Sequence, residues 1–379
     1  MKETARDAVD ARGGRKGSFK TQHMQGNVKE NMEGSRIRYL GAGEKLATRA
    51  LYEAAFPEDS REFTDYYYKW KIKDNEIIVM EGAGRDSSFH VMIHLNPYQV
   101  SIYGETMEVP YLVAVATAKE QRRQGKMGAV MRHALRDMER RRLPFTFLLP
   151  ADPAYYRGQG FVFFPCQQPF AVQGEGITGN IDCETATTWD TAQMAAFANR
   201  ILGQRYGIYI RRDAYYYRRA LAELEAEHGN ALLLKNHGEL CGILLYGLDG
   251  AESGGTAEVK ELLLEKMISE EDARYLCKRI LESQGIMAEP KCTVSRMMVR
   301  IVALTELVPA LRSSKPVSLA VKVEDAIIEA NNGCFQIDID ETGGRLKRIP
   351  AALAERQADI AELSEELFRN SAVYLNEWV

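Results

Sequence analysis

The sequence lacks any apolar run long enough to cross a membrane as a helix. Its longest apolar runs, 110–116 and 145–150, have the length of buried strands. The N-terminal residues MKETARDAVDARGGRKGSFKTQ are charged and lack the apolar core of a secretory signal peptide. We therefore expect a cytoplasmic protein with no membrane partner, in which residues 1–35 form a disordered extension.

Cysteine, histidine and net charge are also low. The six cysteines show no Cys-x-x-Cys spacing, which favours free thiols in a reducing cytosol. His90 and His94 are four residues apart in an expected strand, but the six histidines form no ligand pattern and no metal is expected. With 49 Lys and Arg against 53 Asp and Glu, the formal net charge of −4 gives no reason to expect a nucleic-acid partner.

The hydrophobic pattern of the first part of the chain alternates between strand and helix periods, which predicts an α/β domain around a mixed sheet. The expected strands are 36–40, 76–82, 89–95, 109–117 and 145–149, and the expected helices are 44–56, 61–73 and 126–142. Asn96–Pro97 has the composition of a turn. Pro144 is expected to end the helix at 126–142.

Two further units follow. The second echoes the first, with helices at 189–203, 213–228 and 270–285 and strands at 230–235 and 240–247. The third begins near residue 296, with a strand at 296–304, a helix at 304–313, strands at 317–322 and 333–339, and a long helix from 350 to about 370. The chain length of 379 residues is sufficient for such an arrangement.

The segment QRRQGKMGAVM, from Gln121 to Met131, joins an expected buried strand to a helix. A helix start offers unpaired N–H groups and a partial positive charge, and Gly125 lets the backbone approach an anion closely. Arg122, Arg123 and Lys126 add cations, although each opposes the helix dipole by a few tenths of a kcal/mol unless an anion binds. The segment matches neither a P-loop nor a dinucleotide-binding pattern, so it is either a phosphate site or a solvated basic helix turn.

In its context this segment resembles the coenzyme A pyrophosphate loop of the GNAT acetyltransferases. VAVATAKEQRRQG, then LLPADPAYYRGQGF, then the terminal YLNEWV are similar to the Eis-like (enhanced intracellular survival) branch, over residues 36 to 379. The resemblance implies an α/β (α+β) architecture of tandem GNAT-type domains, a catalytic one at 36–175 and a second at 176–295. It also implies a sterol-carrier-protein-like domain at 296–379 and, since relatives form hexamers, a homo-oligomer.

The same resemblance implies acetyl-CoA as co-substrate. Its expected contacts are the main chain of Val115, Ala116 and Thr117 for the pantetheine arm, then Arg123, Gln124, Gly125, Lys126, Met127 and Gly128 for the pyrophosphate, and Ala151 and Asp152 beside the thioester. Met127 stands where the general motif has Gly or Ala, and Gln124 replaces an arginine common in the branch. The N–H of Val115 is the expected oxyanion donor.

Tyr156 matches the tyrosine that protonates the leaving thiolate in the family, with Tyr155 as its neighbour and fallback. The alternative is that both tyrosines only pack in the core. The expected base is the terminal carboxylate of Val379, which burial must raise from a pKa of about 3.5. The apolar tail VYLNEWV can supply that burial, or it can be a packed terminus with no chemistry.

Together these features predict an N-acetyltransferase that acts on a primary amine of an aminoglycoside, a polyamine or a lysine side chain. The segment FPEDSREFTDYYYKW combines Glu58, Asp59 and Asp65 with Tyr66–Tyr68 and Trp70, which suits a cationic acceptor. The same pattern also fits an amphipathic helix whose tyrosines pack on the sheet. The competing function is a non-catalytic carrier of CoA or of a small apolar ligand in the third domain.

Overall fold

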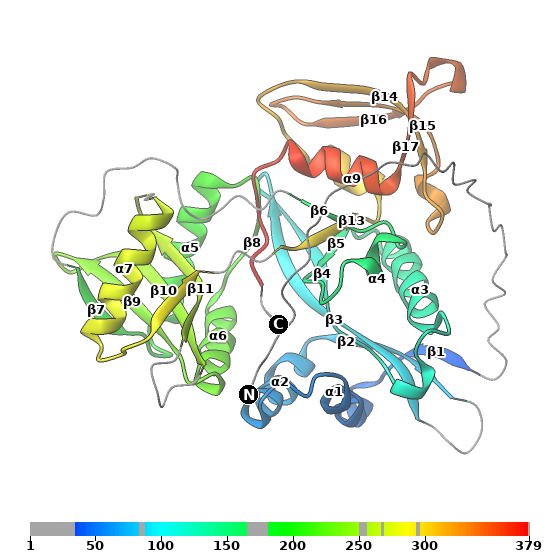
Figure 1. Cartoon of the computed structure of the whole chain (residues 1–379). Coiled ribbons are helices and arrows are strands. Elements are labelled where there is room, and N and C mark those ends of the chain that lie inside the picture. Colours follow the sequence, from blue (N-terminus) through cyan, green and yellow to red (C-terminus); the bar gives the residue numbers. More distant parts are fainter. Residues whose placement is uncertain are drawn as a thin grey trace, which may run out of the picture. The chain divides into compact units, whose positions relative to one another are not determined.

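The computed structural model describes residues 35–82, 88–164, 181–249, 256–266, 269–292 and 296–377, whose strands form three sheets (Figure 1). The helices are α1 Arg49–Ala55, α2 Arg61–Trp70, α3 Lys126–Arg140, α4 Ala154–Arg157, α5 Thr191–Arg205, α6 Ala214–Ala226, α7 Glu270–Ser283, α8 Leu304–Ala310 and α9 Ile360–Arg369. Short 3-10 helices are η1 Ala42–Thr48, η2 Lys71–Lys73, η3 Lys119–Gln121, η4 Glu329–Asn331 and η5 Ala351–Leu353.

The first sheet contains β1 Arg36–Tyr39, β2 Glu76–Glu81, β3 Phe89–Ile102, β4 Glu105–Thr117, β5 Phe145–Leu148, β6 Val162–Phe163, β8 Ile208–Ile210, β13 Met298–Ile301 and β18 Val373–Tyr374. Its main path is β1-β2-β3-β4-β5-β13-β6, with β8 paired to both β3 and β18. Ile77 and Val79 pack with α1 and α2. The alternating Ile78 and Met80 are buried on the other face, where α3 lies against β2 and β3 (Figure 1).

The second sheet has the order β12-β11-β10-β9-β7. Its strands are β7 Asp182–Thr185, β9 Asn230–Asn236, β10 Glu239–Asp249, β11 Thr256–Leu264 and β12 Glu289–Cys292. Leu233 and Ile243 pack with residues of α5 and α6. Leu232 and Leu244 pack on the opposite face with residues of α7, so helices cover both faces.

The third sheet, in the order β16-β15-β14-β17, shares one hydrophobic core with the first. Its strands are β14 Val317–Glu324, β15 Gly333–Ile339, β16 Gly344–Arg348 and β17 Arg356–Asp359. Phe335 of this sheet, Phe368 of α9 and Phe147 of β5 belong to the same buried cluster. The mixed α/β class is confirmed, whereas the extents of the three expected domains stay predictions.

The expected turn at Asn96–Pro97 is wrong, because β3 runs through it as a long strand. Pro97 lies opposite Pro110 in the β3–β4 ladder. On its other side, the pairing of β3 with β2 ends at Leu95 and the pairing with β8 begins at Val100. Pro97 therefore lies opposite the gap between β2 and β8, where its missing N–H costs no ladder hydrogen bond.

The strand expected at 296–304 is present as β13, which lies between β5 and β6 in the first sheet. The start expected for the long helix of the third unit is wrong. The expected helix from 350 to 370 begins only at Ile360, because β17 before it pairs in parallel with β14. Asp359 and Glu362 form a capping box at this later start.

Several features bear on the composition-based expectations. Cys183, Cys241 and Cys334 are free thiols, as expected. Within the ranges that the structure describes, no helix is both long and apolar enough to cross a membrane. The expected extension at 1–35 falls almost wholly outside the described residues.

Candidate functional site

The site is built where β4 and β5 part. These parallel strands pair only at Tyr111–Phe147 and Leu112–Leu148. β5 then ends, while β4 continues to Thr117. Ala114 and Val115 lie together opposite Ile93 of β3, so β4 carries a bulge, and Ala114 has a positive φ of 49°. The last five residues of β4 thus have β3 on one side and no paired strand on the side of β5.

The main chain at the end of β4 points toward this unpaired side. Ala118 N–H donates to the carbonyl oxygen of His90 at 2.9 Å, so Ala118 faces β3. Because successive residues of an antiparallel strand alternate, the N–H and C=O of Thr117 face away from β3. The Thr117 carbonyl accepts from Arg122 Nε at 3.1 Å, in agreement with this direction. An extended ligand arm can therefore pair here as an added strand.

The turn from β4 into α3 has the backbone expected for anion binding. Gly125 is the N-cap of α3, with a left-handed φ of 74° and no side-chain cap. A Cβ built on Gly125 would meet no atom within 4 Å, so the helix start faces open space. Arg123 also has a positive φ, of 60°. The first N–H groups of α3 are thus presented without a capping side chain, an arrangement that suits an anion such as a phosphate.

The side chains of this turn differ in their roles. Arg123 and Gln124 are exposed, and the Gln124 amide folds back to donate to the Glu120 carbonyl at 3.0 Å. Lys126 Nζ lies 3.1 Å from His90 Nδ1 and also donates to the Gln121 side chain. Met127 and Gly128 are half-buried in the first turn of α3. The expected pyrophosphate residues therefore lie together at one helix start, although Gln124 points back along the chain.

Tyr156 lies in α4, the short helix after β5. It is only 6% exposed, and its ring packs edge-on against Phe161 with centroids 6.0 Å apart. Burial raises the pKa of Tyr156 to about 12. Its hydroxyl has no hydrogen-bond partner in the described part of the chain. Tyr155 is 60% exposed, so the structure distinguishes the candidate acid from its fallback.

Ala151 and Asp152, the residues expected beside the thioester, lie between β5 and α4. Both are exposed. Asp152 Oδ1 accepts from the Ala154 N–H at 2.9 Å, and its carbonyl accepts from Tyr155 N–H at 3.2 Å. Asp152 thus organises the start of α4, which carries Tyr156.

A surface cavity of about 1040 Å³ adjoins the end of β4 on the α1 side. Thr117 and Arg122 contribute to its wall, together with apolar residues such as Leu51 and Phe89. Its charged lining combines Arg38, Glu44, Glu81, Lys119, Glu120 and Arg122. The cavity therefore reaches the expected cofactor strand and has room for a large ligand.

A second cavity, of about 50 Å³, is lined by polar groups from the first sheet, α6, β11 and the last described residues. Glu377 accepts from the hydroxyls of Tyr98, at 2.7 Å, and Tyr216, at 2.8 Å. Burial raises the pKa of the Glu377 carboxyl, against the opposing effect of Lys71 and Arg212. Arg219 also lines this cavity, and its Nε is buried without a partner among the described residues.

This second cavity is connected by aromatic rings to the point where β4 and β5 part. The Tyr98 ring lies 6.2 Å from Tyr111, and Tyr111 stacks on Phe147 at 5.0 Å. Tyr111 and Phe147 form the first of the two β4–β5 pairs. Sequence reasoning missed Glu377, for which the single signal was a lone acid inside the apolar tail.

The tyrosines of the segment FPEDSREFTDYYYKW are not exposed to an acceptor. Tyr66, Tyr67 and Tyr68 are buried, with hydroxyls bonded to Glu223, His94 and Thr48. The interpretation that they pack on the sheet is therefore confirmed, and the tyrosines do not line an open acceptor cleft. Val379, the expected base, lies outside the described residues, which end at Glu377.

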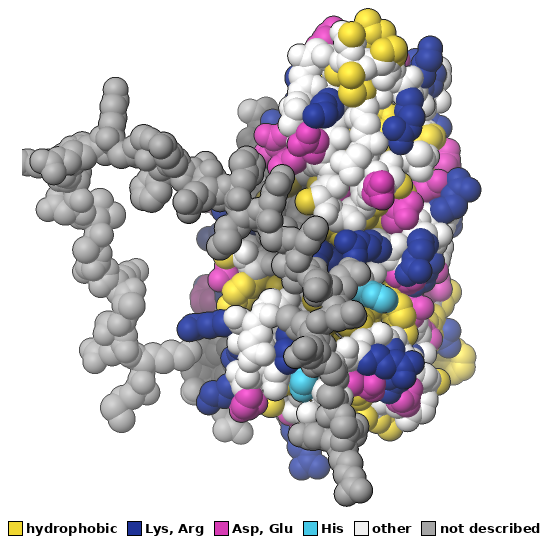
Figure 2. All heavy atoms as spheres, turned by 90° about the vertical axis from the view of Figure 1, so that its right-hand side faces the viewer, with side chains coloured by type: hydrophobic (Ala, Val, Ile, Leu, Met, Phe, Trp, Pro, Cys, Tyr) yellow, Lys and Arg dark blue, Asp and Glu magenta, His cyan; other side chains and the backbone are white. Residues whose placement is uncertain are grey.

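Charge is mixed over the surface. On the face shown in Figure 2, Lys and Arg side chains are interspersed with Asp and Glu side chains. His94 is buried, and burial lowers its pKa to about 3, so it stays neutral near pH 7. Among the described residues, no group of three or more His, Cys, Asp or Glu could hold a metal ion.

Comparison with known proteins adds a family for the first part of the chain. Residues 36–164 match a family model described as an acetyltransferase (GNAT) domain. This stretch holds β1 to β6 and with them both the α3 start and Tyr156. No curated protein sequence matches the chain. The prediction of a GNAT-type acyltransferase enzyme is confirmed at the level of this domain.

Solved structures resemble most of the chain. A probable N-acyltransferase from Enterococcus faecalis V583 has a TM-score of 0.67 at 18% identity, over 87% of this chain and 88% of its own. A GCN5-related N-acetyltransferase from Anabaena variabilis has a TM-score of 0.68 at 15% identity, over 87% and 89%. Eis1 from Mycobacterium abscessus has a TM-score of 0.62 at 14% identity, over 88% and 89%. These likenesses show a shared fold.

Proposed function

We propose that the chain transfers an acetyl group from acetyl-CoA to a primary amine. The observation that carries this proposal is the presence, inside the GNAT domain, of the end of β4 beyond its pairs with β5, the α3 start at Gly125 and the buried side chain of Tyr156. The first binds an extended arm, the second an anion, and the third supplies a proton. Acetyl-CoA needs all three.

In the proposed reaction the amine nitrogen forms a bond to the acetyl carbon, and the carbon–sulfur bond of the thioester breaks. The N–H of Val115, a residue of the β4 bulge, stabilises the oxyanion that forms between these events, a role carried over from the sequence expectation. The leaving thiolate takes the proton of Tyr156, whose raised pKa keeps that proton available at neutral pH. The amine proton passes to the terminal carboxylate of Val379, a role taken from the resemblance.

The acceptor we propose is a cationic amine, such as an aminoglycoside, a polyamine or a lysine side chain. The buried tyrosines of α2 no longer support this choice. The second cavity holds two carboxylates, Glu223 and Glu377, together with the cations Lys71, Arg219 and Lys260, so the acceptor class is proposed from the resemblance. A homo-oligomer and a sterol-carrier-like third domain remain part of the proposal by resemblance.

The carrier alternative has weaker support. The cavity described at the third sheet, beside Leu311, Ile339 and Leu367, measures about 10 Å³. Ligand pockets commonly measure about 300–1000 Å³. This cavity is thus small for an apolar ligand, and it gives the carrier function no specific site.

An acetyl-CoA consumption assay tests the function. Purified protein is given acetyl-CoA and, in turn, aminoglycosides, polyamines and lysine peptides, and thiol release is followed with a colorimetric reagent. We expect amine-dependent release with at least one of these three classes. Silence across the panel, together with CoA binding measured by calorimetry, would instead favour a carrier.

A further inference from the structure

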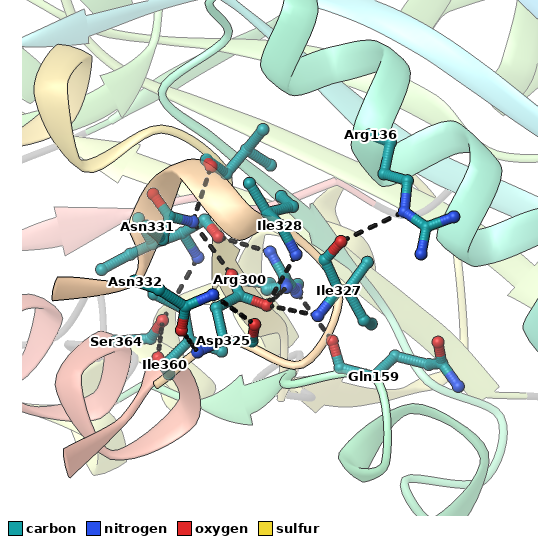
Figure 3. Close-up of polar contacts among 12 residues, drawn as sticks. Arg136, Gln159, Arg300, Asp325, Ile327, Ile328, Asn331, Asn332, Ile360 and Ser364 are labelled. Carbon is teal, nitrogen blue, oxygen red and sulfur yellow. Dashed lines mark hydrogen bonds and ion pairs between the residues drawn. The ribbon is translucent and has the colours of Figure 1, made fainter. Parts of the chain in front are cut away.

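A buried ion pair outside the GNAT domain is attached to the loop that carries Tyr156. Arg300 of β13 and Asp325, which follows β14, pair at 2.7 Å with both side chains fully shielded from solvent (Figure 3). Replacing a buried pair by apolar residues is often neutral or stabilising, so stability alone explains such a pair weakly. A role in positioning is the better explanation here.

Each of the three guanidinium nitrogens of Arg300 donates a hydrogen bond. Nη2 binds Asp325, Nη1 donates to the Ile301 carbonyl at 2.7 Å, and Nε donates to the Gln159 carbonyl at 2.7 Å. The last bond joins residues 141 positions apart in the sequence. A planar guanidinium holds these acceptors in a fixed fork, which a lysine ammonium cannot reproduce.

Asp325 fixes the other side of the pair. Its carboxylate accepts from the N–H groups of Ile327 and Ile328, at 2.9 and 3.0 Å, and from the Asn331 amide at 2.9 Å (Figure 3). The same turn contacts α3, because the Ile327 carbonyl accepts from Arg136 Nε at 3.1 Å. The 325–332 turn is therefore bonded both to the helix that starts at the proposed pyrophosphate site and to Arg300.

Gln159 connects Arg300 to Tyr156, because its main chain is hydrogen-bonded to both residues. Gln159 N–H donates to the Tyr156 carbonyl at 2.9 Å. Its side-chain amide lies against the first turn of α3, since a Cβ on Gly128 would come within 3.3 Å of it. Gly160 follows with φ +84°, and a Cβ there would lie 3.1 Å from Arg300 Nε. The loop is therefore closely fitted between Arg300 and α3.

We propose that Arg300 is a positioning residue for acyl transfer. By holding the Gln159 carbonyl, it keeps Tyr156 in a fixed position relative to the first turn of α3, and the Asp325 turn is its anchor. The inference rests on the proposed function, and it gives the turn after β14 of the third sheet a part in the proposed active site, through Arg300 of the first sheet.

The test compares Arg300→Lys with Ser364→Ala. Ser364 is buried at the same interface, where its hydroxyl accepts from Ile301 N–H at 3.2 Å and donates to the Ile360 carbonyl at 2.7 Å (Figure 3). It has no bond to the 157–161 loop among the described residues. Both changes remove buried hydrogen bonds, but only the first releases Gln159.

For Arg300→Lys we expect kcat to fall about tenfold or more, because small misplacements of a catalytic group are costly. The Kd for acetyl-CoA should stay within about twofold, since the main-chain contacts at Gly125 are untouched. Amide hydrogen exchange in 154–161 should quicken. Ser364→Ala should change neither kcat nor this exchange. If Arg300→Lys does not fold, Arg300→Gln with Asp325→Asn removes both charges together and carries the same expectations.

Unchanged kcat in Arg300→Lys, or an equal fall in Ser364→Ala, would overturn the proposal. An inactive wild-type protein would instead refute the proposed function. In that case the exchange of 154–161 alone decides whether Arg300 holds the loop: faster exchange in Arg300→Lys supports it, and unchanged exchange refutes it.

Discussion

Replacing Gly125 by alanine tests the α3 start as an anion site. Gly125 has a φ of 74°, a conformation that costs a residue with a Cβ about 1–2 kcal/mol. The new methyl group would meet no atom within 4 Å, so no clash adds to this strain. If the turn relaxes to relieve it, the N–H groups of the first helical turn move. Each charge-assisted hydrogen bond lost to the pyrophosphate weakens binding by about 1.5–3 kcal/mol, roughly ten- to hundredfold.

Gly238→Ala is the matched control. Gly238 lies in the turn between β9 and β10, has a φ of 84°, and would also meet nothing within 4 Å. We expect both variants to lose a similar free energy of unfolding, about 1–2 kcal/mol in a urea titration. Only Gly125→Ala should raise the Kd for acetyl-CoA, measured by isothermal titration calorimetry. Wild-type affinity in Gly125→Ala, or an equal loss in Gly238→Ala, would refute the assignment.

Three further outcomes are expected. Tyr156→Phe should lower kcat about 100-fold or more with little change in the acetyl-CoA Kd. In the wild type, burial raises the Tyr156 pKa to about 12, so a plot of kcat against pH should show no fall with a midpoint near pH 10.0, the ordinary tyrosine value. Glu377→Gln should be more stable than wild type at pH 8 in urea titrations. Because the pKa of the Glu377 carboxyl is raised in the folded state, the wild type loses stability as pH rises past the unfolded pKa of about 4.3. The difference in unfolding free energy between variant and wild type should therefore vanish in acid. A difference that stays constant with pH would contradict this reasoning. A peptide extension after Val379 should abolish acetyl transfer but not CoA binding, and full activity of the extended protein would rule out the terminal carboxylate as base.

The elements around the proposed cofactor site could be predicted because their signals are local. The helix at Lys126 begins where glycine and a change of hydrophobic period coincide in the sequence, and it was expected at that residue. Tyr156 was separated from Tyr155 by a family pattern, and burial now distinguishes the two. Such signals need no knowledge of distant parts of the chain.

The errors arise where distant parts meet. An apolar strand such as β13 carries no mark of its neighbours, so its pairing with β5 could not be foreseen. The tyrosines of α2 have the same helical pattern whether they face a cleft or the core. Arg300 and Asp325, 25 residues apart, look like ordinary surface charges in the sequence. Their partners are fixed only by the tertiary fold.

The most direct test of the account is amide hydrogen exchange with and without CoA. The end of β4 beyond its pairs with β5 and the uncapped first turn of α3 should exchange quickly in the free protein, because N–H groups there have no hydrogen-bond acceptor among the described residues. Bound CoA should slow exchange in 113–117 and 124–129, and leave the β9–β10 turn at 236–239 unchanged. Unaltered exchange in both of the first two segments at saturating CoA would contradict the placement of the cofactor.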